Sequence, residues 1–255
     1  MALNPRIRDW QGRRVWIVGA STGIGLALAH KLAGQGARVV MSARNATRLQ
    51  AAADTVPQAV AVPLDVSIAA QWPQAAQQAS VALGALDVVF FNAGTYAPLR
   101  AWELQSESAR ESFETNVLGI YNGLAACLPS MLARGAGHVV LVASVAGYGG
   151  LPKALAYGPG KAALINLAES LYMDLAPRGI GVTLVNPGFV ATPLTAQNDF
   201  RMPALITAEQ AADDILRGLR AGCFEIHFPK RFSLFLKLLG CLPRAWYFRL
   251  VGRLA

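Results

Sequence analysis

A chain of 255 residues, 54% hydrophobic and only 15% charged, is long enough to bury a large core, and its composition excludes general disorder. Six of its 23 Lys and Arg residues follow Glu225 with no acid among them, which leaves 17 bases against 15 acids in the body of the chain. The body is therefore nearly neutral, and the net charge of +8 gives no reason to expect nucleic-acid binding.

The sequence predicts neither a membrane span nor secretion. No apolar run reaches the roughly 18 residues that a spanning helix needs, and the apolar stretch at 15–18 is too short for a signal peptide. Cys127, Cys223 and Cys241 lack metal-ligand spacing, and three is an odd number for disulfides. We therefore expect reduced thiols, no bound metal and a cytoplasmic location.

Strand and helix signals alternate along the chain, and the expected strands are nearly continuous Val, Ile and Leu runs. In chain order, strands are predicted at 14–18, 37–42, 59–64, 86–91, 138–142, 181–185 and 224–228. Helices are predicted at 26–33, after Asn45 as an N-cap, and at 67–83, 108–132, 155–176 and 208–219. This pattern is typical of a parallel sheet covered on both faces. The predicted fold class is α/β: one doubly wound, Rossmann-type domain over 1–228 with about seven strands, followed by an amphipathic helical tail over 229–255.

A glycine-rich turn follows the first predicted strand. Glycines let the backbone turn tightly and approach a pyrophosphate, while the start of the next helix supplies oriented N–H groups. A turn without any ligand looks similar in isolation, but its place after the first strand of an alternating chain favours a dinucleotide. The predicted cofactor contacts in this turn are Gly19, Ser21, Thr22, Gly23, Ile24 and Gly25.

The end of the second strand predicts which dinucleotide binds. A carboxylate at this point accepts a hydrogen bond from the adenosine ribose and repels a 2′-phosphate. This chain instead has Ser42-Ala43-Arg44-Asn45, and a guanidinium binds phosphate well. We therefore predict NADP(H) over NAD(H), with Arg44 on the phosphate; the alternative is that Arg44 is merely solvated.

Two further strand ends carry candidate cofactor residues. Asp65, followed by Val66, ends the third strand and either accepts from the adenine amino group or caps the next helix. Asn92-Ala93-Gly94 ends the fourth strand, where small residues leave room for a flat ring. Asn92 also suits a turn in which it bonds its own backbone, and the two roles are compatible.

Tyr157 and Lys161 stand four residues apart in a predicted helix and so share a face. A nearby ammonium favours phenolate, so we expect Lys161 to lower the pKa of Tyr157 from about 10 toward neutrality. That shift would make Tyr157 a candidate proton donor and acceptor, with Ser144 holding a substrate oxygen beside it. In isolation, a Tyr-x-x-x-Lys pair is also typical of a solvated helix face.

Together these motifs resemble the short-chain dehydrogenase/reductase family over residues 12–228. The motifs appear in the family order: Gly19-x-x-x-Gly23-Ile24-Gly25, Asp65, Asn92-Ala93-Gly94, Asn116, Ser144, Tyr157-x-x-x-Lys161, then Asn186-Pro187-Gly188 through Thr192. Gly158-Pro159-Gly160 departs from the Ser-Ala-Ser that is common in the family. Proline is tolerated in a first helical turn, so this helix is expected to begin close to Tyr157.

The resemblance implies a role for each candidate catalytic residue. Tyr157 would exchange a proton with the substrate oxygen, Ser144 would hydrogen-bond that oxygen, and Lys161 would bind the nicotinamide ribose. Asn116 would hold a water that links Lys161 to solvent. The implied reaction is hydride transfer between NADP(H) and a carbonyl or alcohol. Further implied cofactor contacts are Tyr157, Lys161, Pro187, Gly188, Val190 and Thr192.

The substrate and partners are less constrained. Ser144, Tyr148 and Phe189 lie near strand ends, where such folds bind ligands, and are predicted to contact an apolar ketone or aldehyde. One alternative is a reductase of lipid-like 3-ketoacyl or 3-ketosphinganine compounds. Another is a non-catalytic nucleotide-binding regulator, which would be expected to lose catalytic positions that this chain retains. The family implies a homodimer or homotetramer.

The tail is basic, aromatic and amphipathic. On a helical wheel, Arg249 and Arg253 lie largely opposite an apolar arc of Trp246, Tyr247, Leu250, Val251 and Leu254. Either this arc lies on an anionic membrane surface, or it covers the domain or a neighbouring subunit while the arginines face water.

Overall fold

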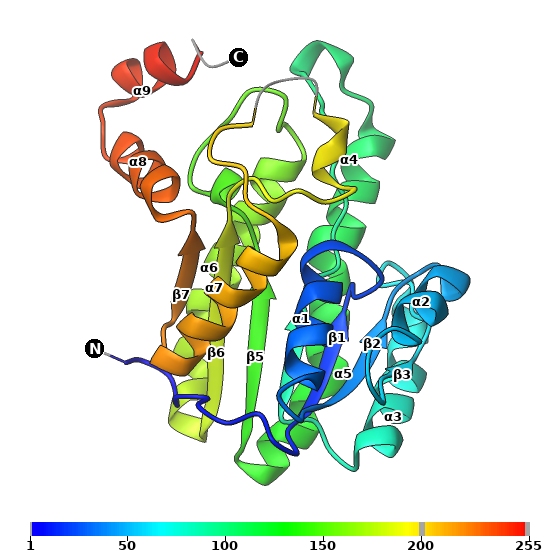
Figure 1. The fold of residues 1–255 in the computed structure, drawn as a ribbon. Helices are drawn as coiled ribbons and strands as arrows, with labels where there is room; N and C mark the ends of the chain where they lie inside the picture. Colours follow the sequence, from blue (N-terminus) through cyan, green and yellow to red (C-terminus); the bar gives the residue numbers. More distant parts are fainter. Residues whose placement is uncertain (1, 199–201, 253–255) are drawn as a thin grey trace.

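A computed structural model describes residues 2–198 and 202–252. Seven parallel strands form one sheet in the order β3-β2-β1-β4-β5-β6-β7 (Figure 1). Their bounds are β1 Arg14–Val18, β2 Arg38–Ser42, β3 Val60–Ala61, β4 Val88–Phe91, β5 Gly137–Val142, β6 Ile180–Pro187 and β7 Glu225–Phe228. The strand order reverses between β1 and β4, and a doubly wound sheet binds its ligand beyond the carboxyl ends of the strands at that point.

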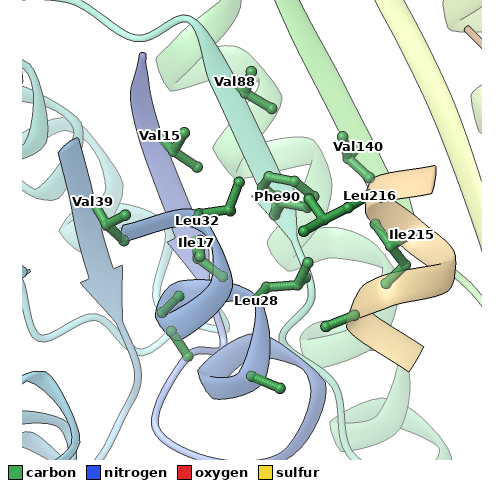
Figure 2. Packing of buried hydrophobic residues seen from close by; sticks show 14 of the residues in the cluster. Val15, Ile17, Leu28, Leu32, Val39, Val88, Phe90, Val140, Ile215 and Leu216 are labelled. Carbon is green, nitrogen blue, oxygen red and sulfur yellow. The ribbon is translucent and has the colours of Figure 1, made fainter. Parts of the chain in front are cut away.

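Helices cover both faces of the sheet, as the sequence predicted. One face carries α1 (Gly23–Ala33), α2 (Ala46–Ala53) and α7 (Ala208–Ala221), and the other carries α3 (Trp72–Leu83), α5 (Gly119–Arg134) and α6 (Tyr157–Leu175). Alternate residues of each strand enter the two cores, because successive side chains of a strand point to opposite faces. Figure 2 shows the first core, where Leu28 and Leu32 of α1 and Ile215 and Leu216 of α7 pack against strand residues that include Val15, Ile17, Phe90 and Val140.

The third strand is shorter than the predicted 59–64, because only Val60–Ala61 pair as a regular ladder. Pro63 has no N–H to donate, which interrupts an edge strand. Two separate bonds keep the chain alongside β2 on either side of the proline, from Val62 N to Met41 O at 2.9 Å and from Leu64 N to Ala43 O at 3.1 Å. The segment therefore reaches the predicted edge of the sheet without being a full strand.

The helix predicted at 108–132 is interrupted. It begins as α4 (Ser106–Phe113), passes through one π-helical turn at Glu114–Leu118 and continues as α5. By length and composition alone, the run Ser106–Arg134 would also cross a bilayer. Ile120, Leu124, Cys127 and Met131 of α5 are instead buried against the sheet, so this run is a core layer of the domain.

The tail forms α8 (Lys230–Gly240) and α9 (Arg244–Val251) at the carboxyl end of β7, beside the loops that end the other strands (Figure 1). The predicted apolar arc of the last helix is divided. Tyr247 and Val251 are buried in a small core with Val145, whereas Trp246 and Leu250 are exposed. Leu254 and Arg253 lie outside the described residues, and the division of the chain at residue 228 remains a prediction.

Candidate active site

A cleft of about 590 Å³ opens at the carboxyl edge of the sheet between the ends of β1, β2 and β4. It brings together most of the residues predicted to bind a dinucleotide. Those lining it are Gly19, Ser21, Thr22, Gly23, Ile24, Arg44, Asp65, Val66, Asn92, Ala93, Gly94 and Thr192. The predicted residues Gly25, Pro187, Gly188 and Val190 do not line this cleft, and neither do Ser144, Tyr157 and Lys161.

Glycine is required in the first turn by close backbone contacts. Gly19 has φ +90°, and a Cβ there would collide with the backbone N of Ala93. A Cβ at Gly25 would collide with the carbonyl O of Gly19, which accepts a hydrogen bond from Asn92 Nδ2 at 2.7 Å. The absence of a side chain at Gly25 therefore lets the start of α1 pack closely against the turn, and Gly25 itself does not line the cleft. These contacts hold the N–H groups at the start of α1 facing the cleft.

The end of β2 presents two arginines and no carboxylate. Ser42 is buried and accepts a hydrogen bond from Trp16 Nε1 at 2.9 Å, so it belongs to the core. Arg44 and Arg48 are exposed and line the cleft, and neither guanidinium has a hydrogen-bond partner among the described residues. Asn45 caps α2 by accepting from Arg48 N at 2.8 Å, as predicted, and this cap places Arg48 in the first turn. Arg48 was missed from the sequence, although its place three residues after the predicted N-cap Asn45, at the start of a helix that follows the second strand, was a usable signal.

Asp65 does not cap the next helix, because the N-cap of the 3-10 turn at Ala69–Gln71 is Ile68 and that of α3 is Gln71, and the adenine contact of Asp65 stays a prediction. Asp65 Oδ1 accepts from Ser67 N at 3.0 Å and Ser67 Oγ at 2.7 Å, while the residue also lines the cleft. Asn92 donates its Nδ2 hydrogen bond to Gly19 O in the glycine-rich turn, and it also lines the cleft. The sequence did not predict that Thr95, Glu111, Glu114 and Thr115, on the far wall, would line it as well.

The candidate catalytic side chains meet behind this cleft. Tyr157 is the first residue of α6, as expected, and Lys161 lies one turn further along it. Ser144 follows β5, and its Oγ accepts from Ala146 N at 3.1 Å. Lys161 Nζ donates to the carbonyl O of Val142 at 2.9 Å and lies 5.5 Å from the centre of the Tyr157 ring. The Tyr96 ring packs edge-on against Tyr157 at 5.0 Å.

The expected lowering of the Tyr157 pKa by Lys161 is wrong for this structure. Burial disfavours the phenolate and raises the pKa of Tyr157 to about 12, with a smaller opposing effect of a hydrogen bond from Ser144. Lys161 is itself buried, and burial lowers its pKa to about 8. Its ammonium points to the Val142 carbonyl instead of the phenol. Without a ligand, Tyr157 is therefore a protonated phenol at neutral pH.

Asn116 occupies the π-helical turn and is fully buried. Its Nδ2 donates to Thr95 O at 2.9 Å, and its Oδ1 accepts from Thr95 N at 3.1 Å. A Cβ built on Gly94 would lie 3.0 Å from Asn116 Oδ1 and 3.6 Å from Lys161 Nζ, so the amide and the ammonium converge beside that glycine. Single π-helical turns are frequent at functional sites because they redirect a side chain.

The segment after β6 packs against other strand ends. Pro187 O accepts weakly from Ser144 Oγ at 3.4 Å, and Val190 is buried. A Cβ at Gly188 would lie 3.1 Å from the Phe232 ring of α8. Thr192 alone of the four predicted cofactor residues here lines the cleft.

The predicted substrate residues lie toward the tail. Tyr148 donates its hydroxyl to Glu225 Oε1 at 2.6 Å, and the Phe189 ring packs 5.6 Å from Phe232. Glu225 also accepts from Asn186 Nδ2 at 2.8 Å and from Lys237 Nζ at 2.5 Å. This Glu225 network was not predicted from the sequence, and the contact of Tyr148 with substrate stays a prediction.

A family model described as short chain dehydrogenase matches residues 13–202. The chain belongs to the short-chain dehydrogenase family. It is 37% identical over 235 residues to an uncharacterized oxidoreductase of Myxococcus xanthus, covering 91% of this chain and 93% of that protein. It is 31% identical over 228 residues to the ketoacyl reductase HetN of a Nostoc species, covering 84% and 78% respectively.

Solved structures of the same family superpose closely. A short-chain dehydrogenase/reductase from Burkholderia phymatum in complex with NAD gives a TM-score of 0.84 at 27% identity, covering 91% of this chain and 94% of that one. A short-chain dehydrogenase from Burkholderia cenocepacia in complex with NADP also gives 0.84, at 26% identity, covering 95% and 99%. The chain is therefore an oxidoreductase of the short-chain dehydrogenase type with a nicotinamide dinucleotide fold. The cleft fits such a dinucleotide, because the glycine turn and the first residues of α1, Gly23 and Ile24, line it and leave the backbone N–H groups at the helix start open to a phosphate.

Proposed function

We propose that this short-chain dehydrogenase transfers hydride between NADP(H) and a carbonyl or alcohol group, and that it prefers NADP(H) to NAD(H). The observation that carries the preference is the pair Arg44 and Arg48 at the end of β2, exposed to the cleft and without partners among the described residues. No carboxylate stands at that strand end to repel a 2′-phosphate. Two guanidiniums supply the charge and the donors that such a phosphate requires.

The catalytic roles follow from the chemistry of the residues behind the cleft. The bound nicotinamide supplies or accepts the hydride. During reduction, the protonated Tyr157 hydroxyl gives its proton to the substrate oxygen, and Ser144 donates a hydrogen bond that fixes that oxygen. Lys161 places a positive charge beside them, and its buried ammonium is within reach of the loop at Gly94. Asn116 holds that loop in place through its two hydrogen bonds with the Thr95 backbone.

An apolar ketone or aldehyde is the proposed substrate class. Tyr96, edge-on against Tyr157, gives the reacting end an aromatic wall. The likeness to a ketoacyl reductase keeps a lipid-like 3-ketoacyl or 3-ketosphinganine compound as the second candidate.

We further propose a homodimer or homotetramer in the cytoplasm. The helices α5 and α6, with the π turn before them, leave large apolar side chains exposed: Leu118, Tyr121, Leu132 and Met173. Exposed large apolar side chains on neighbouring helices are in keeping with a subunit contact. The three cysteines are free thiols, in keeping with a reducing compartment.

The cofactor preference is tested by comparing the wild-type protein with Arg44→Ala and Arg48→Ala. Initial rates with NADPH and with NADH are measured on a panel of ketones and aldehydes by loss of the reduced nicotinamide absorbance. Each lost phosphate contact should raise KM for NADPH about tenfold and leave KM for NADH nearly unchanged. Arg8→Ala, a change of the same kind at an exposed site outside the cleft, is the control. If the ratio of the KM for NADPH to the KM for NADH were unchanged in the double variant Arg44→Ala/Arg48→Ala, the assignment would be refuted.

A further inference from the structure

The two tail helices have an inner and an outer side. On the inner side, Leu236 and Leu239 of α8 and Tyr247 and Val251 of α9 pack against the loop that follows Ser144. Tyr247 also donates to Gly150 O at 2.9 Å. The tail is thus fixed on the domain by its buried apolar residues. Its exposed apolar residues need a separate explanation.

The outer side exposes large apolar side chains on both helices. We call these the outer apolar residues: Leu234, Phe235 and Leu238 of α8, and Trp246, Phe248 and Leu250 of α9. Leu238 and Phe248 are 66% and 64% exposed. Six such side chains within two short helices are a concentration that a monomer in water rarely leaves uncovered.

The charge around the outer apolar residues has one sign. Lys230, Arg231, Arg244 and Arg249 are exposed, and the sequence contains no acid after Glu225. Within the described residues, none of these four cations forms an ion pair, whereas Lys237 is paired with Glu225. The Arg249 guanidinium lies 5.9 Å from the Trp246 ring, so charge and aromatic surface are adjacent.

This charge pattern disfavours a second copy of the chain as the partner that covers the outer apolar residues. A twofold contact would place the same patch on both sides and bring arginine against arginine with no carboxylate between them. An anionic bilayer supplies what the patch lacks: phosphate groups for the cations and an apolar layer for Trp, Phe and Leu.

We propose that the outer side of α8 and α9 binds the surface of membranes that contain anionic phospholipids. The tail lies at the carboxyl edge of the sheet (Figure 1), and it packs on the loop that follows Ser144 and leads to Tyr157 at the start of α6. Binding there turns the end of the domain that carries the site toward the lipid. The proposal stands independently of the cofactor and of the substrate class.

The test is co-sedimentation of the purified full-length protein with vesicles of phosphatidylcholine alone or mixed with phosphatidylglycerol. We compare wild type with Arg231→Gln/Arg244→Gln/Arg249→Gln. The matched control is Arg8→Gln/Arg178→Gln/Arg220→Gln, which removes the same charge from exposed sites outside the tail. Leu238→Ser, set against Val81→Ser on exposed α3 surface, tests the apolar part. NADPH oxidation by each variant reports that the domain is intact.

We expect wild type to sediment with the mixed vesicles at low salt and to be released by high salt. The tail arginine variant should bind about 100-fold more weakly, from roughly 1 kcal/mol for each arginine at an anionic surface, and the control variant should bind as wild type does. Leu238→Ser should bind more weakly than Val81→Ser. The proposal is wrong if wild type stays in the supernatant with mixed vesicles, or if both arginine variants lose binding equally. It is also wrong if light scattering shows a dimer that Leu238→Ser dissociates while vesicles bind nothing.

Discussion

Lys161 carries a buried charge that should destabilise the folded chain. The residue is 4% exposed, and burial lowers its pKa from 10.5 to about 8. One pKa unit corresponds to about 1.4 kcal/mol, so keeping the ammonium charged at pH 7 costs on the order of 3 kcal/mol relative to the unfolded chain. Removing it would leave the Val142 carbonyl without its donor, which costs about 1 kcal/mol.

We therefore expect Lys161→Met to raise the free energy of unfolding at pH 7 by about 2 kcal/mol, because Met is unbranched and fills a similar space. In a chain of this length, that gain corresponds to a melting temperature higher by roughly 4 to 8 °C. The same variant should lose nearly all reductase activity. Stability would rise as function falls, as is common where a functional site holds a strained or desolvated group.

The pH dependence gives a second, independent readout. Between pH 8 and 10.5 the unfolded chain still binds a proton that the folded chain has released, so wild-type stability from this group increases with pH in that window. Lys161→Met should lack this increase. Thermal denaturation at pH 7 and near pH 10 measures both effects, with Lys230→Met as the same change at an exposed site. A Lys161→Met protein that melts below wild type at pH 7 and keeps the wild-type pH dependence would refute this reasoning.

Four shorter predictions concern the rest of the site. Tyr157→Phe should fold and bind NADPH but lose carbonyl reduction by more than about 100-fold in kcat; turnover within tenfold of wild type contradicts the proton-donor role. Because burial raises the pKa of Tyr157 to about 12 and lowers that of Lys161 to about 8, the reduction rate should hold from about pH 6 to pH 7 and fall only as Lys161 loses its charge, while alcohol oxidation depends differently on pH because it needs the deprotonated Tyr157; identical pH profiles for reduction and oxidation would contradict these roles. Gly25→Ala should weaken dinucleotide binding at least tenfold by calorimetry, because its Cβ meets Gly19 O, whereas Gly240→Ala, with open space, should not. Glu225→Gln should lower the melting temperature by a few degrees, as Lys237 loses its charge partner; no change would show the Glu225 network to be dispensable.

The sheet and its cofactor edge were predictable because each depends on local patterns. Continuous apolar runs such as 14–18 and 138–142 can be satisfied only by strands covered on both faces, and the structure confirms both. The glycine turn was predictable for the same reason, since close backbone approach admits no other residue at Gly19. Asn45 as a cap and Tyr157 as the first residue of α6 follow from short-range rules and are also confirmed.

The errors concern properties that depend on neighbours distant in sequence. The pKa of Tyr157 depends on how deeply the ring is buried, which the spacing to Lys161 does not reveal. The hydrogen bond from the Tyr148 hydroxyl to Glu225, a residue 77 positions later, was likewise not predictable from the sequence. The helical wheel of the tail could not show that Tyr247 faces the loop after Ser144 while Trp246 faces outward. Long-range packing decides each of these cases.

The π-helical turn at Glu114–Leu118 bears on which insertions and deletions this chain tolerates. Each residue of an α-helix rotates the next by about 100°, so deleting one residue there would swing Asn116 away from Thr95 or turn Leu124 and Cys127 out of the core. The π turn holds one residue more than a regular α turn, and this extra residue lets both Asn116 and the core residues of α5 face inward. Changes in length between 106 and 134 should therefore be far less acceptable than changes in side chain.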